Sequence, residues 1–155
     1  MAHVEESIVV NVPVSTAYNQ WTQFEEFPRF MEGVESVTQK DDTHHHWVAE
    51  IGGERREWDA EITEQVPDQR VAWQAIGGHG NSGVVTFQPV DEDSTKITVR
   101  MEHETEGLKE QLGSVLGADS RRVKGDLERF KEFIEERGRE TGAWRGEVES
   151  GQRVR

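Results

Sequence analysis

The stretch SRRVKGDLERFKEFIEER, residues 120–137, determines the architecture that the rest of the chain must complete. Its apolar residues recur at helical spacing and form one stripe. The stripe consists of Val123, Leu127, Phe130 and Ile134, with Phe133 beside it. The opposite face is charged and must point to water. A helix with two such different faces needs an apolar surface to lie on, which the remaining sequence must supply.

Residues on either side of this stretch predict where the helix begins and ends. Asp119 and Ser120 are good N-cap residues, because their side-chain oxygens can accept hydrogen bonds from the first free N–H groups,. Gly138 stands where a C′ glycine commonly ends a helix,. We therefore expect one long amphipathic helix near the end of the chain.

Length and composition limit the class of protein. A chain of 155 residues is most simply one domain that can bury a core without covalent cross-links,. The net charge of −13 disfavours nucleic acid or an anionic membrane as a partner, since both would repel the protein,. The chain has no cysteine, and its N-terminus lacks the apolar core of a signal peptide,. We expect a cytoplasmic protein with no stable membrane insertion, because no apolar stretch approaches the roughly 20 residues of a membrane span.

Much of the chain before this helix alternates between apolar and polar residues, which is typical of strands,. We expect strands over residues 3–12, 34–39, 44–51, 55–65, 70–76, 84–90 and 96–104. Short turns separate the last six, so neighbours should pair antiparallel, because parallel pairs need long crossovers. Each long strand has one apolar and one solvated face. A single sheet with one apolar face, covered by an amphipathic helix, is a two-layer α+β domain.

Shorter helical segments are expected at two further places. After the first strand, two short helices should span about residues 15–22 and 24–31, because Pro28 forbids one continuous helix,. Residues 106–117 should form another helix, which its glycines would kink or break before the long helix begins,.

The last residues differ from the rest in composition. We assign residues 1–138 to one domain and residues 139–155 to a polar, flexible C-terminal tail, because the tail is glycine-rich and has no apolar periodicity,. Trp144 is the one large aromatic residue of the tail, and it either docks on the domain or stays exposed.

The apolar face of the predicted sheet mixes very large and very small side chains. Ala49, Ala60 and Ala75 share that face with three tryptophans. Strongly curved sheets leave a hollow beneath their helix, and such a mixture is suited to lining it. Ordinary packing of large against small residues, without a hollow, remains the alternative.

The opening SIVVNVPVSTAYNQWTQFEEFPRFMEGVESV, residues 7–37, carries several motifs in order. A first strand ends at Val12-Pro13, and a helix bearing Trp21 follows. An aromatic-Pro-x-aromatic turn then leads to a Gly-Val-x-x-Val strand that begins at Gly33. In these features the chain resembles the polyketide cyclase/dehydrase and lipid-transport family of the START-like superfamily, also called SRPBCC. The likeness covers about residues 3–137.

This resemblance implies a helix-grip fold. A seven-stranded curved antiparallel sheet would wrap around the long C-terminal helix, with two short helices after the first strand and a deep apolar cavity inside. Members of the superfamily bind lipids, isoprenoid quinones, polyketides or plant hormones, and some catalyse cyclisation and dehydration of a bound polyketide. The resemblance assigns no catalytic residue to this chain.

Strand alternation and helical spacing together predict the side chains that would bind a ligand. These are Trp47, Arg56, Trp58, Trp73, Phe87, Met101, His103, Val123, Leu127 and Phe130. Arg56 and His103 are the candidates for orienting the polar end of the ligand, or for catalysis if the protein is an enzyme. Each also has a simpler interpretation: the arginine reaches solvent or pairs with an acid at the end of its strand, and the histidine is a satisfied core residue or is exposed.

The run His44-His45-His46 does not predict a metal site. On a strand, His44 and His46 point to one side and His45 to the other, so only two imidazoles can converge. There is no cysteine, and no further ligand stands at a suitable spacing,. We expect no metal and no cofactor. His45 shares the parity of Trp47 and has the same interpretations as His103: a proton donor or polar anchor, or a histidine that is satisfied in the core or exposed at the strand end.

The function that these features favour is binding of a small or medium hydrophobic ligand, as a carrier or sensor. The ligand would be a lipid, an isoprenoid or an aromatic polyketide-like molecule. One alternative is a polyketide cyclase/dehydratase acting on a poly-β-ketone in the same cavity. Another is a non-catalytic interaction module whose cavity is filled by its own side chains. The partner would be a hydrophobic small molecule, and the protein a monomer or a homodimer.

Overall fold

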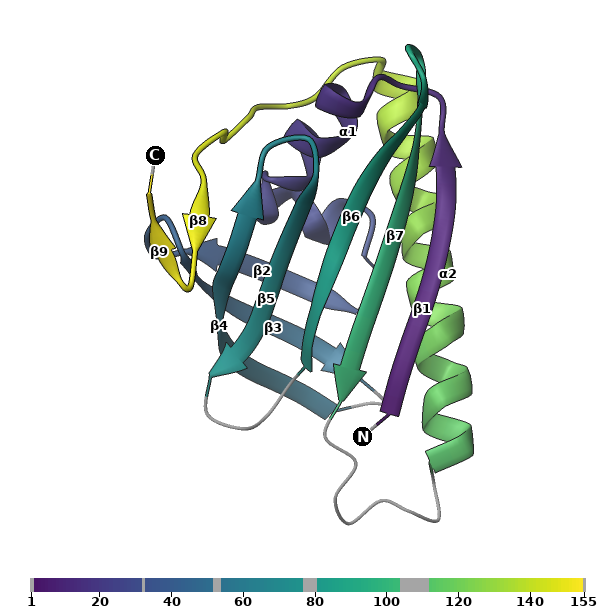
Figure 1. Cartoon of the computed structure of the whole chain (residues 1–155). Coiled ribbons are helices and arrows are strands. Elements are labelled where there is room, and N and C mark those ends of the chain that lie inside the picture. The colour runs from purple at the N-terminus through teal and green to yellow at the C-terminus, as the bar shows by residue number, and fades with distance from the viewer. Residues whose placement is uncertain (1, 32, 52–53, 77–80, 104–111, 155) are drawn as a thin grey trace.

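The computed structural model describes residues 2–31, 33–51, 54–76, 81–103 and 112–154. Its main elements are shown in Figure 1. In chain order they are β1 (Ala2–Val10), α1 (Val14–Trp21), the 3₁₀ helix η1 (Phe24–Arg29), β2 (Val34–Gln39), β3 (His44–Ile51), β4 (Glu54–Val66), β5 (Arg70–Ile76), β6 (Asn81–Asp91), β7 (Ser94–His103) and α2 (Leu112–Arg137). Two short strands, β8 (Val148–Glu149) and β9 (Gln152–Arg153), follow near the C-terminus.

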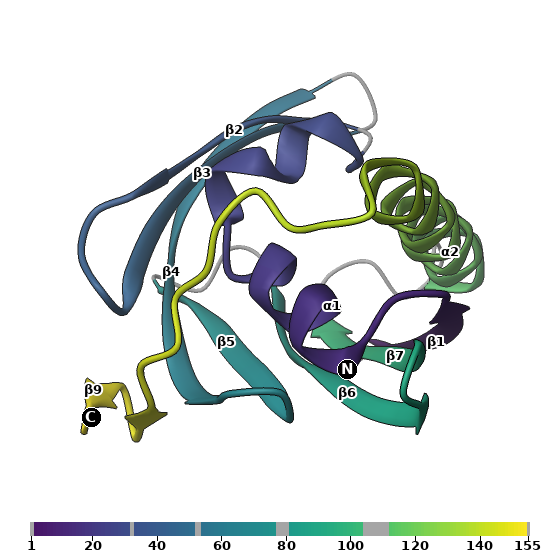
Figure 2. The same ribbon diagram turned by 90° about the horizontal axis from the view of Figure 1, so that it is seen from above.

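The seven long strands form one antiparallel sheet in the order β1-β7-β6-β5-β4-β3-β2. β1 pairs with β7 along its whole length, from Ala2 opposite His103 to Val10 opposite Thr95. Seen from above, β2 to β4 form one wall and β5, β6, β7 and β1 form the other, while α2 lies at the side where the walls are open (Figure 2). The predicted helix-grip architecture, a curved sheet around a long C-terminal helix, is confirmed.

The sheet bends at β4, because the two halves of this strand have different neighbours. Residues 54–61 pair with β3, whereas residues 59–66 pair with β5. The register with β5 shifts between Ile62 and Glu64, which marks a β-bulge. Since a bulge bends a strand and increases its twist, β4 passes from one wall to the other and makes the inner face of the sheet concave.

α2 places its apolar stripe against this concave face. All the stripe residues identified from spacing are buried: Val123, Leu127, Phe130 and Ile134. Gly138 follows the helix with φ +76° and donates its N–H to the Ile134 carbonyl at 2.9 Å, so a C′ glycine ends the helix as predicted,. None of the helices in the described ranges is long and apolar enough to cross a membrane.

The start of α2 differs from the sequence prediction. We expected a separate helix over residues 106–117 and a new helix beginning at Asp119 or Ser120. α2 instead runs without a break from Leu112, while residues 104–111 lie outside the described residues. An isolated glycine costs a helix only about 1 kcal/mol. Burial of the long apolar stripe offsets that cost, so the glycines at 113 and 117 do not divide the helix.

The two short helices predicted after the first strand are present. α1 ends at Trp21, and η1 contains Pro28, whose missing N–H is compatible with a short 3₁₀ segment,. Aromatic rings then join both helices to α2: the Trp21 ring lies 5.5 Å from that of Phe27 and 5.1 Å from that of Phe130, centre to centre. This aromatic cluster holds the short helices over one end of the sheet.

The segment after Gly138 packs against the domain, although we expected a flexible tail. β8 pairs with residues 64–65 of β4, on the edge that β3 has left, and Val148 is fully buried. The pairing covers backbone groups of β4 that would otherwise form an open sheet edge. The division of the chain into a domain and a tail at residue 138 remains a prediction.

Polar contacts also hold the segment after Gly138 against α1. Its polar, glycine-rich composition had suggested a flexible tail, but several of its polar groups form hydrogen bonds to the domain. Gln20 and Thr141 form two hydrogen bonds, at 2.8 and 3.1 Å. The backbone N–H of Trp144 donates to Thr22 Oγ1 at 3.0 Å, and the Trp144 ring packs against the core. Polar residues therefore serve here as long-range contacts, which no local periodicity reveals.

Gly33, just before β2, allows α2 to approach the sheet closely. Its φ is +87°, and a Cβ there would lie 2.7 Å from Nη2 of Arg122 and 2.8 Å from the Glu50 carbonyl oxygen. We expect Gly33→Ala to lower the free energy of unfolding, measured by urea denaturation, by about 2–3 kcal/mol, since it combines left-handed strain with a steric conflict. Gly138→Ala is the control: its φ is +76° with nothing within 4 Å. The control should cost about 1 kcal/mol, and equal losses would contradict the close approach.

The packed C-terminal segment gives a second prediction. Val148→Ala should lower the free energy of unfolding by about 2 kcal/mol, because two buried methyl groups are lost. Val154→Ala is the matched control, since Val154 is 49% exposed and lies in the same segment. It should change stability by less than about 0.5 kcal/mol. If both variants have the same stability as the native chain, the segment is detached in solution.

Candidate functional site

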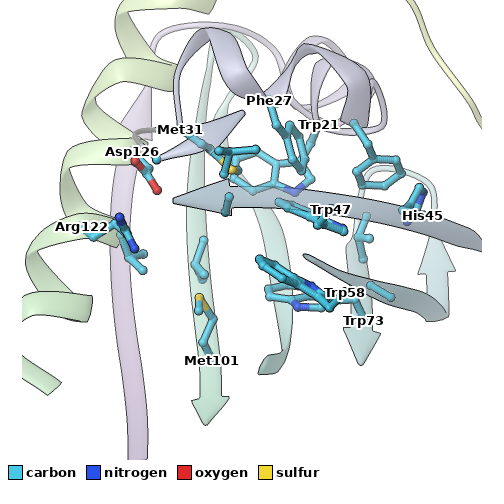
Figure 3. Close-up of a pocket in the computed structure, with 18 of the residues that line it drawn as sticks. Trp21, Phe27, Met31, His45, Trp47, Trp58, Trp73, Met101, Arg122 and Asp126 are labelled. Atoms are coloured by element: carbon cyan, nitrogen blue, oxygen red, sulfur yellow. The ribbon is translucent and has the colours of Figure 1, made fainter. Parts of the chain in front are cut away.

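A cavity of about 150 Å³ lies between the concave face of the sheet, the short helices and α2. Apolar side chains from η1, β3, β4, β5, β7 and α2 make up most of its wall. Among the described lining residues, those with titratable side chains are His45, Arg122 and Asp126. In Figure 3, His45 lies at one end of the cavity and the two charged residues of α2 at the other, with the labelled tryptophans of β3, β4 and β5 between them.

Strand register explains the tryptophan wall. Trp47 of β3 lies opposite Trp58 of β4, and their rings stack with centres 5.8 Å apart and 10° between their planes. Trp73 of β5 lines the cavity beside them. Because side chains alternate along a strand, Ala49 and Ala60 point inward next to these rings. Their small size leaves the space unfilled.

His45 is the polar residue at the β3 end of the cavity. Its side chain is 1% exposed, and its ring lies 4.2 Å from that of Phe24, centre to centre. Burial lowers the pKa of His45 to about 4, so the imidazole is neutral at pH 7,. Within the described ranges, no hydrogen-bond partner meets its Nε2 or the Nε1 of Trp47. Since buried polar groups normally have partners, these two atoms are open hydrogen-bonding positions.

Arg122 and Asp126 stand about one turn apart on α2, at the other end of the cavity. The guanidinium of Arg122 lies against Gly33. Asp126 is paired with Arg129, whose Nε donates to the Phe30 carbonyl at 2.9 Å. These contacts fasten α2 to the segment that connects η1 with β2.

The fold and the cavity can be compared with known proteins. The family model for polyketide cyclase / dehydrase and lipid transport matches residues 10–134. The chain belongs to this family. The match runs from the end of β1 to the last stripe residue of α2, so it includes every described residue that lines the cavity. The resemblance inferred from the opening motifs is therefore confirmed.

Individual relatives agree with the family assignment. An uncharacterized 17.2 kDa protein from the melC2-rnhH intergenic region of Streptomyces lincolnensis is 58% identical over 149 residues, which cover 96% of this chain and 99% of the relative. A crystal structure of a Deinococcus radiodurans protein is 27% identical with a TM-score of 0.68, and covers 88% of this chain and 98% of its own. The Zhui aromatase/cyclase of a Streptomyces species is 16% identical with a TM-score of 0.70, covering 92% and 98%. This last likeness shows the fold alone.

The sequence predicted ten ligand-binding side chains. Six of these ten side chains line the cavity in the structure. They are Trp47, Trp58, Trp73, Met101, Val123 and Leu127. The sheet brings the first four together from four different strands, and α2 supplies the other two. Whether they contact a ligand stays a prediction.

The remaining four are placed differently. Arg56 pairs with Ala49 but has an exposed side chain and does not line the cavity, because inward parity does not ensure burial near the end of a strand. Phe87 and Phe130 are buried against Trp21 in the aromatic cluster and are not part of the cavity wall. His103 ends β7, and its side chain lies outside the part that the structure describes.

The sequence interpretation missed the polar side chains of the cavity. His45 was placed on the inward face by its parity with Trp47 but was not included among the predicted ligand-binding residues. Arg122 and Asp126 received no role, yet each directly precedes a stripe residue of α2. Residues that flank an apolar helical stripe reach the margins of a cavity beneath it, so this spacing was the available signal.

His44 and His46 lie on the other face of β3, as strand alternation predicts. Nδ1 of His46 is 2.9 Å from Oδ1 of Asp59, and its Nε2 is 3.1 Å from Oε1 of Glu57. These carboxylates raise the pKa of His46. No group of three or more possible metal ligands occurs among the residues in the described ranges.

Burial of His45 predicts a pH dependence of stability. Its pKa is 6.5 when solvated and about 4 when folded, so the unfolded chain binds the extra proton between these values. Stability is therefore lost as the pH falls from 6.5 toward 4, by about 3 kcal/mol in total,. His45→Phe removes this titration, so its free energy of unfolding should fall less over the same interval.

Urea denaturation at several pH values between 7 and 4 measures the difference between the two proteins. All other groups titrate in both proteins, including His46, whose raised pKa acts in the opposite direction, so their effects cancel in the comparison,. Parallel stability profiles would contradict a buried, neutral His45.

Proposed function

We propose that this protein binds a small hydrophobic ligand in the cavity between the sheet and α2, as a carrier or sensor. The observation that supports this most strongly is an unfilled cavity of about 150 Å³ whose wall is mostly apolar and aromatic. Binding would come mainly from apolar burial, worth about 25 cal/mol per Å² before ordering costs. Membership of a family described by polyketide cyclisation and lipid transport supports the same class of ligand.

The size of the cavity narrows the choice within that class. A protein cavity of roughly this volume binds benzene, whereas pockets for drug-sized ligands span about 300–1,000 Å³. The cavity therefore suits one or two fused rings, or the ring end of a longer isoprenoid or polyketide-like molecule. A longer ligand would need the wall to move, and Met31 and Met101 are the unbranched side chains best able to do so,.

The enzyme alternative receives less support. It assigned catalysis to Arg56 and His103, and the exposed side chain of Arg56 does not line the cavity. The titratable groups that line the cavity in the described part of the chain stand at opposite ends of it, with the tryptophans between them. Turnover of a poly-β-ketone by the purified protein, lost in His45→Phe, would nevertheless favour the cyclase/dehydratase function over carriage.

The interaction-module alternative predicted that the protein's own side chains would fill the cavity. Ala49 and Ala60 are both 2% exposed and line the space without filling it. This arrangement favours a ligand over a packed core.

A binding experiment with an enlarged side chain tests the proposed function. 1-Naphthol is uncharged at neutral pH and has the two fused rings that the cavity can hold, so we expect it to bind the native protein and to quench its tryptophan fluorescence. Ala60→Leu should weaken that binding at least about tenfold, because the added atoms occupy the cavity.

Ala72→Leu is the matched control. Ala72 belongs to β5 between the lining residues Val71 and Trp73, so its side chain points to the outer face,. This variant should bind the probe like the native protein. Absence of binding to the native protein, or equal affinities of the two variants, would refute a ligand site in this cavity.

A further inference from the structure

The polar groups of the cavity differ between its two ends. At the α2 end, Asp126 is already engaged by Arg129. At the other end, His45 and Trp47 stand two residues apart on the inward face of β3, and both line the cavity. Among the described residues, neither Nε2 of His45 nor Nε1 of Trp47 has a hydrogen-bond partner, although both atoms are buried. This end of the site is therefore incomplete without a ligand.

The chemistry of these two atoms restricts what can complete it. An indole N–H only donates, so the group that faces Trp47 must accept a hydrogen bond. A neutral imidazole donates or accepts at Nε2, depending on its tautomer. A carbonyl oxygen can accept from either side chain, and a hydroxyl can also donate to the imidazole. A hydrocarbon would leave both buried atoms unsatisfied, which is unfavourable.

The surroundings also disfavour a charged ligand group at this end. The His45 ring packs on Phe24 at 4.2 Å, and the described lining residues other than His45, Arg122 and Asp126 carry no titratable side chain. The imidazole is itself uncharged at neutral pH, and Arg122 lies at the far end of the cavity (Figure 3). An anion such as a carboxylate would be desolvated here without a cationic partner.

We propose that the ligand is an uncharged, ring-containing molecule with a hydroxyl or carbonyl oxygen, and that His45 and Trp47 bind this oxygen. The ring would lie among Trp47, Trp58 and Trp73, with its oxygen directed to the β3 end. Phenols and cyclic ketones fit this description, whereas plain hydrocarbons do not, and a carboxylate does not fit the β3 end of the cavity. The inference rests on the proposed function and adds to it the chemical class of the ligand.

Three probes of equal ring size test the inference: naphthalene, 1-naphthol and 1-naphthoate. Their affinities can be measured by isothermal titration calorimetry and by quenching of tryptophan fluorescence. The native protein should bind naphthol about tenfold more tightly than naphthalene, as one buried hydrogen bond implies, and naphthoate more weakly than either.

Substitutions then locate the preference. Trp47→Phe removes the indole N–H, and His45→Phe removes both imidazole nitrogens. Each variant keeps an aromatic ring, so each should reduce the naphthol preference while naphthalene affinity changes little. His44→Phe is the matched control, because it makes the same change on the outer face of the same strand. It should keep the full preference.

The outcomes separate the two proposals. Absence of binding of all three probes would overturn the proposed function itself. Binding of naphthalene and naphthol with equal affinity, or a preference that survives in both Phe variants, would overturn only the role of His45 and Trp47.

If a variant does not fold, the ¹⁵N chemical shift of the His45 ring in the native protein decides whether His45 binds the oxygen. Addition of naphthol should move the Nε2 resonance and naphthalene should not, and a resonance that stays fixed with naphthol would overturn the inference.

Discussion

Burial of the apolar stripe of α2 requires a concave surface, and the bend in β4 provides it. A flat sheet would touch the helix along one line, whereas this sheet has walls on both sides of it (Figure 2). Residues 59–61 are the only part of β4 paired with both β3 and β5, so the direction of the sheet changes there. The same curvature keeps Trp47 and Trp73, on separate walls, around a space that Ala60 does not fill. The packing of the helix and the presence of the cavity therefore have one geometric cause.

Contacts between distant segments hold this arrangement in place. Arg129 of α2 reaches the Phe30 carbonyl beside the short helices, and the guanidinium of Arg122 lies against Gly33, where a Cβ would come within 2.7 Å of Nη2. The C-terminal segment adds a further connection: Arg145 is 2.8 Å from Asp68 after β4 and 2.6 Å from Asn19 of α1. The short helices that cover the cavity are thus held by α2 on one side and by the C-terminal segment on the other.

Periodicity made the sheet, the long helix and six of the cavity residues predictable. Alternation along a strand and spacing along a helix state directly which face a side chain takes, and Trp58 and Leu127 follow from these rules alone. Neither rule states how far along a strand the cavity extends, which is why Arg56 was placed inside. Nor does either rule show a long-range polar contact such as that between Gln20 and Thr141, so the packing of the last residues was missed. The open Nε2 of His45 depends on what surrounds it in three dimensions, and no sequence pattern contains that information.

The energetic cost of a cavity that the protein's own side chains do not fill favours a protein that works with a ligand. At about 24 cal/mol per Å³, a cavity of about 150 Å³ corresponds to roughly 3–4 kcal/mol of lost packing,. Each buried polar atom without a partner costs a further 1–3 kcal/mol or so. Domains of this kind are stable by only about 5–15 kcal/mol, so these costs are a substantial fraction of the total. Substitutions could remove most of these energetic costs without altering the fold: larger aliphatic residues in place of Ala49 and Ala60, and an apolar residue in place of His45. A ligand that fills the cavity and bonds to His45 would remove the same costs on binding, and the bound protein would be correspondingly more stable than the free one.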